Sequence, residues 1–165
     1  MTSSSWVFVP LRIVLALLLV GLVAIETLSV PGQFRHMAAQ APELGAVPWV
    51  LMTLVILELV AVQVVIVCIW RLLDMVRADR IFSTASHAPV DVIVWTVAVA
   101  WAAFVGVSVY LVGVIFFTPA LRDPGTPILL LGLDLLGGVP VLVLVVLRAL
   151  LRQATVLRTD LEAVI

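Results

Sequence analysis

Residues 47–80 read VPWVLMTLVILELVAVQVVIVCIWRLLDMVRADR, and the contrast within this stretch decides the fold. Residues 47–70 contain one charged side chain, Glu58, and are otherwise almost entirely apolar. A helix that crosses the hydrocarbon core of a bilayer needs about 20 such residues. Charged side chains then return close together: Arg71, Asp74, Arg77 and Arg80. The stretch therefore predicts a transmembrane helix followed by a polar exit from the membrane.

The composition of the whole chain agrees with this prediction. Of 165 residues, 64% are hydrophobic and 12% are charged. A soluble domain has roughly half apolar and a quarter charged residues. The net charge of −1 provides no basic surface for direct binding of nucleic acid. We therefore place the chain among integral membrane proteins, with the lipid bilayer as its first partner.

Four apolar stretches are long enough to cross a membrane, and turn-forming residues separate them. They cover residues 7–28, 47–70, 90–117 and 128–151. Pro31 and Gly32 are expected to end the first, which we expect to be a retained helix rather than a cleaved signal peptide because it is too long and lacks a cleavage site. The prediction is an all-α fold. One membrane domain, residues 1–165, forms a four-transmembrane-helix bundle with an amphipathic C-terminal cytoplasmic extension, residues 152–165.

The distribution of arginine predicts the orientation of the chain. Seven arginines would lie on one side of the membrane: Arg12, Arg71, Arg77, Arg80, Arg148, Arg152 and Arg158. Only Arg35 and Arg122 would lie on the other side. Because cytoplasmic loops carry the excess of basic residues, we expect a multi-pass protein of the cell (cytoplasmic) membrane with both termini in the cytoplasm.

The C-terminal extension repeats apolar residues at steps of three and four, which is the pattern of an amphipathic helix. The repeat comprises Leu150, Ala154, Leu157, Leu161 and Val164. Such a helix could lie on the membrane or pack on the exit of the second span, or it could dock a cytoplasmic protein. The candidate partner surface combines both exits: Arg71, Arg77, Arg80, Leu157, Asp160 and Leu161.

Two acids lie inside the predicted spans, where a charged side chain is costly and suggests a function. Glu58 falls near the middle of the second span and Asp134 falls in the outer half of the fourth. Glu58 is expected to be protonated or to hydrogen-bond to Gln63, Thr53 or Ser108. Each acid is either a proton or cation site or a neutral group that fixes helix packing.

No catalytic, cofactor or metal site is predicted, and the chain is not expected to be an enzyme. His36 and His87 fall on opposite sides of the membrane, so they cannot share a metal ion. Gly132, Gly137 and Gly138 lack the residues of a phosphate-binding loop, and close helix packing is the expected use of all three.

Several segments resemble the domain-of-unknown-function family 2975, in its actinobacterial branch. They are VQVVIVCIWRLLDMVRADRIFS (62–83), VDVI (90–93), PGQF (31–34), APEL (41–44) and LRTDLEAVI (157–165). His87 and Pro89 depart from the family pattern. The resemblance implies a bacterial four-helix membrane protein without an established activity, and a small helix-turn-helix regulator as a partner.

Two functions follow as hypotheses. The first is a regulatory or sensory membrane protein that tethers or signals to a cytoplasmic partner. The alternative is a small proton- or cation-coupled transporter that uses Glu58 and Asp134, acting as a homo-oligomer. An intramembrane enzyme has no supporting motif.

Overall fold

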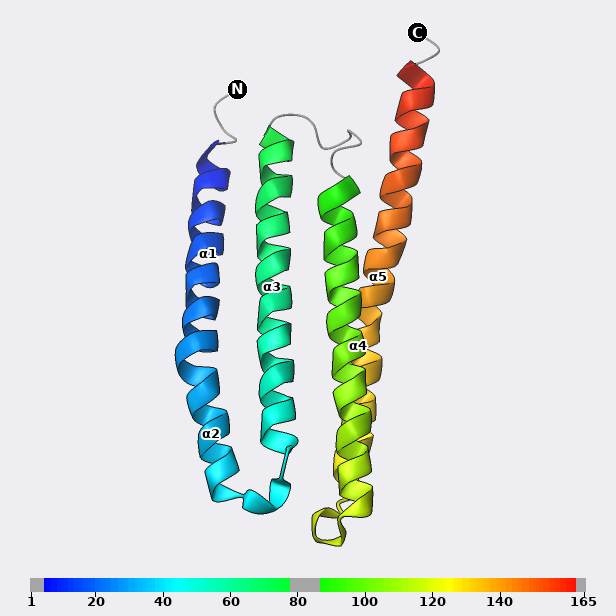
Figure 1. The fold of residues 1–165 in the computed structure, drawn as a ribbon. Coiled ribbons are helices and arrows are strands. Elements are labelled where there is room, and N and C mark those ends of the chain that lie inside the picture. Colours follow the sequence, from blue (N-terminus) through cyan, green and yellow to red (C-terminus); the bar gives the residue numbers. More distant parts are fainter. Residues whose placement is uncertain (1–4, 78–86, 163–165) are drawn as a thin grey trace.

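The computed structural model describes residues 5–77 and 87–162, and every regular element within them is helical (Figure 1). Four helical stretches are long and apolar enough to cross a membrane: Val9–Gln40, Val47–Val76, Ala88–Phe117 and Gly125–Val156. The all-helical prediction and its four membrane-spanning helices are confirmed. The chain is accordingly a multi-pass membrane protein.

The first stretch continues beyond its expected end at Leu28. Helix α1 (Ser5–Ala24) passes through a short π-helical segment (Ile25–Ser29) into α2 (Val30–Gln40). A proline inside an α-helix lacks one N–H, and its ring clashes with the carbonyl four residues earlier. Here the Val30 N–H bonds to the Ile25 carbonyl, five residues back. We attribute the continuation to this wider turn, which lets the helix accommodate Pro31 instead of stopping there.

The starts of the next two helices use residues suited to those positions. A 3₁₀ turn (Pro42–Leu44) leads to Gly45, whose φ of 55° favours glycine, and then to α3 (Val47–Arg77). Helix α4 (His87–Phe117) has Pro89 in its first turn, where a missing N–H costs nothing.

A second 3₁₀ turn (Pro119–Leu121) precedes the longest helix, α5 (Gly125–Glu162). Asp123 caps the start of α5. Its carboxylate accepts bonds from the Thr126 hydroxyl at 2.6 Å, the Gly125 N–H at 3.0 Å and the Thr126 N–H at 3.2 Å. These bonds, that of the Thr126 hydroxyl first, lower the pKa of Asp123 below its usual value.

The helices pack mainly against their neighbours along the chain. Helices α1 and α2 lie on α3, α3 on α4, and α4 on α5. Few side chains are fully buried between them, and most large apolar side chains of the spans are exposed. In water so much exposed apolar surface would cause association, whereas the acyl chains of a bilayer cover it without penalty.

One end of the molecule gathers four helix ends. There α1 begins, α3 ends, α4 begins and α5 ends, and α5 projects beyond the other three (Figure 1). The turn after α2 and the turn between α4 and α5 lie at the opposite end. We call the first the terminal end, because the described chain begins and ends there.

Candidate functional site

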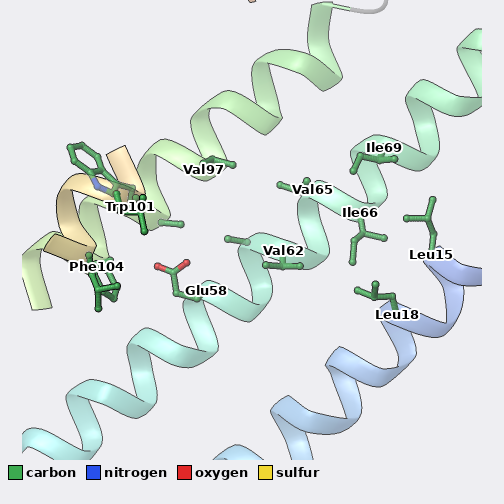
Figure 2. Close-up of a pocket in the computed structure, with 15 residues that line it drawn as sticks. Leu15, Leu18, Glu58, Val62, Val65, Ile66, Ile69, Val97, Trp101 and Phe104 are labelled. Atoms are coloured by element: carbon green, nitrogen blue, oxygen red, sulfur yellow. The ribbon is translucent and has the colours of Figure 1, made fainter. Parts of the chain in front are cut away.

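A groove of about 770 Å³ lies among the four long helices and is lined almost entirely by apolar side chains. Helices α1, α3, α4 and α5 all contribute to it (Figure 2). Its walls include Leu15, Leu18, Val62, Val65, Ile66, Val97, Trp101, Phe104, Leu133 and Leu136. Few contacts join α5 to α1 or α3, so the helices do not close over this space.

Glu58 is the acidic residue of the groove. Figure 2 shows its carboxylate pointing from α3 toward Trp101 and Phe104 of α4. Its Oε1 atom is buried and has no hydrogen-bond partner. A buried acceptor without a partner costs free energy, because it has lost its bonds to water and gained none in exchange. The site therefore offers an acceptor for a donor that the described part of the protein does not supply.

The partners expected for Glu58 are engaged elsewhere, so that part of the prediction is wrong. The Gln63 amide donates to Glu26 Oε2 at 2.7 Å, which joins α3 to the π-helical segment. The Thr53 hydroxyl donates to the carbonyl of Trp49, one turn earlier in α3, at 2.9 Å. Sequence spacing identified groups at a suitable depth, but the rotation of each helix decides which of them meet.

Ser108, the third expected partner of Glu58, binds the other intramembrane acid. Ser108 is 3% exposed, and its hydroxyl donates to Asp134 Oδ1 at 3.0 Å, across the α4–α5 interface. The Trp101 indole N–H donates to the main-chain carbonyl of Asp134 at 2.8 Å. Two bonds thus join Asp134 to α4, which matches the packing role considered for this acid.

Two glycines of α5 make room for the Trp101 ring. A Cβ atom at Gly137 would lie 3.0 Å from Trp101 Cδ1, and one at Gly138 would lie 3.4 Å from Cζ2. A Cβ at Gly132 would meet nothing within 4 Å. Close packing is therefore confirmed for Gly137 and Gly138, and it is wrong for Gly132, which faces away from the other helices.

Glu58 and Asp134 do not share one site. Glu58 lines the groove, whereas Asp134 is absent from the lining and its carboxylate is bonded to Ser108. Trp101 lies between them, because it lines the groove and bonds to the Asp134 carbonyl. Of the two candidate acids, only Glu58 has a buried acceptor atom left open.

Ion pairs between helices near the terminal end were not predicted from the sequence. Arg12 of α1 pairs with Asp74 of α3. Asp91 of α4 pairs with Arg148 at 2.5 Å and with Arg152 at 3.3 Å, both on α5. Opposite charges at one predicted depth were the available signal, since all five residues lie near the same end of a predicted span.

The predicted partner surface is described only in part. Arg71 is exposed on α3. Arg80 lies outside the described residues, and of Arg77, Leu157, Asp160 and Leu161 only the helical backbone is described. Within residues 5–77 and 87–162, no three His, Cys, Asp or Glu side chains lie close enough to hold a metal ion.

Comparison with known protein families gives a match over most of the chain. The model of the family described as Protein of unknown function (DUF2975) matches residues 32–165. No curated protein and no solved structure matches the chain.

Proposed function

Because the chain belongs to the DUF2975 family, whose function is unknown, we propose a role from its own geometry. It is a sensory or regulatory protein of the cell membrane. It holds a cytoplasmic protein on the part of α5 that extends beyond the bilayer.

The length of α5 is the observation that carries this proposal. The helix has 38 residues without a break, so it is about 57 Å long at 1.5 Å per residue. The hydrocarbon core of a bilayer is only about 30 Å thick. Asp123 caps α5 at the opposite end, so the excess length extends from the terminal end.

The ion pairs of Asp91 also support an extension of α5 beyond the bilayer at the terminal end. Asp91 lies in the second turn of α4 and bonds to Arg148 and Arg152. Beyond Arg152 the backbone of α5 stays helical to Glu162, roughly 15 Å farther. We name residues 153–162 the docking arm. Its apolar repeat in the sequence is typical of a helix that binds in the groove of a partner, and a small helix-turn-helix regulator is the partner we propose.

The orientation we propose follows the arginines. The sequence assigns seven basic residues to the side of the membrane where the terminal end lies, and cytoplasmic segments carry such an excess. Reporters fused after Arg80 and after Ile165 should then be active only as cytoplasmic reporters. Fusions at Gln40 and Asp123 should be active only outside. An active external reporter after Ile165 would reverse the orientation and place the docking arm on the wrong side for a cytoplasmic partner.

The docking arm is tested with two matched double variants. Leu157→Asp with Leu161→Asp places two charges on the apolar repeat. Thr159→Asp with Ala163→Asp places the same charges at the same spacing but off the repeat. Only the first pair should release proteins that copurify with the chain from native membranes. Membrane levels should be equal for both. Retention of every specific partner by the first pair would refute the docking arm.

Proton- or cation-coupled transport is the second candidate, and the open Oε1 atom of Glu58 favours it. Cells that overexpress the chain would then show proton-linked uptake of, or resistance to, a cationic compound. Glu58→Gln, which keeps the shape but cannot exchange a proton, should abolish that activity at an unchanged membrane level. A fully active Glu58→Gln variant would exclude coupling through this residue.

A further inference from the structure

The groove carries an inference that needs neither the docking arm nor transport. We propose that it binds a lipophilic primary amine. The apolar tail of the ligand lies along the groove walls, and its ammonium group donates to the carboxylate of Glu58.

The lining of the groove determines the apolar part of this ligand. A volume of about 770 Å³ is in the range of small-molecule sites, which are mostly apolar with a few placed polar groups. The one indole donor in the lining, that of Trp101, is already used by the Asp134 carbonyl. The tail can enter from the lipid, because Leu18 and Leu136 on two of the walls are 45% and 67% exposed.

The open acceptor of Glu58 determines the polar part. A phospholipid acyl chain in the groove would leave Oε1 unpaired, because hydrocarbon has no donor. An alcohol would donate one hydrogen bond from a neutral group. An ammonium group would donate a hydrogen bond and also add the attraction between opposite charges, which is strong in an apolar site. None of the described residues that line the groove is basic and could compete for the carboxylate. Charge complementarity therefore selects an amine over an alcohol of equal length.

The test measures quenching of Trp101 fluorescence. Trp6, Trp49, Trp70 and Trp95 are replaced by Phe, so that Trp101 alone reports on the groove. The protein is held in phosphatidylcholine nanodiscs. The probes are a ten-carbon primary amine and the matched ten-carbon alcohol, each with a nitroxide on the tail, and a phosphatidylcholine with a nitroxide on its acyl chain. Nanodiscs without protein correct for partition into the lipid.

The amine should quench Trp101 saturably, with half-saturation about tenfold below that of the alcohol, because only the amine adds a charge opposite to that of the Glu58 carboxylate. Glu58→Gln should remove this preference and Glu58→Asp should keep part of it. Glu43→Gln, an equal change of charge at an exposed position outside the groove, should leave it unchanged.

Equal quenching by amine and alcohol would overturn the proposal, as would an unchanged preference in Glu58→Gln. Quenching by the labelled phosphatidylcholine that the amine cannot displace would show that a lipid tail occupies the groove instead. None of these outcomes depends on a cytoplasmic partner or on transport, so this experiment and the test of the docking arm are independent.

Discussion

Gly137→Ala should destabilise the protein, because the added methyl group meets the Trp101 ring. Its Cβ would lie 3.0 Å from Trp101 Cδ1, closer than carbon atoms normally approach. Overpacking of this kind costs about 1–3 kcal/mol. The indole cannot simply move away, since its N–H is bonded to the Asp134 carbonyl at 2.8 Å.

Gly132→Ala is the matched control. It lies in the same helix, and its added Cβ meets nothing within 4 Å. Both substitutions gain helix propensity, up to about 1 kcal/mol relative to glycine. Both variants gain the same helix propensity, so the difference between their free energies of unfolding should report only the clash with Trp101. We expect Gly137→Ala to be less stable than Gly132→Ala by about 1–3 kcal/mol.

The measurement is reversible unfolding by SDS in mixed micelles, followed by far-UV circular dichroism. A second comparison repeats both variants with Trp101→Ala, which removes the whole ring. There the two alanine variants should differ by less than about 0.5 kcal/mol, the usual error of additivity. Equal stability of the two variants with Trp101 present would refute the packing of Trp101 on Gly137.

Three further predictions concern polar groups. Glu58→Leu should leave the free energy of unfolding unchanged or raise it by up to about 3 kcal/mol in the same SDS assay, since it removes a buried acceptor without a partner; a loss would reveal a partner. Asp91→Asn should lower that free energy by about 1 kcal/mol and Arg148→Gln by less, because Asp91 would keep its second arginine; equal losses would contradict the shared pairing. The pKa of Asp123 is lowered mainly by the hydroxyl of Thr126. The stability that the ionised Asp123 cap gives the folded protein should therefore be complete above the unfolded pKa of about 3.9, and it should be lost as pH falls through the lower folded pKa. The amide NMR signal of Thr126 should report that midpoint, and a midpoint at or above 3.9 would contradict the cap.

The sequence predicted the helices well because each carries its own signal. A bilayer requires about 20 apolar residues in each span, and charges or turn residues mark where most spans end. The boundary after α1 was harder, because a local π-helical segment accommodates Pro31 and only the backbone reveals it.

The sequence predicted which residue would form the candidate site, but not the contacts of that residue. Glu58 could be identified because an acid within an apolar span is rare. The absence of a partner for its Oε1 atom could not be predicted, because hydrogen bonding depends on how neighbouring helices are rotated about their axes. A rotation of one residue, about 100°, decides whether Ser108 faces Glu58 or Asp134.

The ion pairs near the terminal end have a consequence for how the chain is made. Arg12 and Asp74 join α1 to α3, and Asp91 joins α4 to Arg148 on α5, so each pair closes one of two consecutive helical hairpins. A ribosome would finish the first hairpin, whose Arg12–Asp74 pair could already form, before the second begins. Each half would then enter the bilayer with an ion pair between its own two helices, and the α3–α4 contact would assemble the two afterwards. If the gene is divided between α3 and α4, the two separately made polypeptides should therefore still associate in the membrane to form the protein.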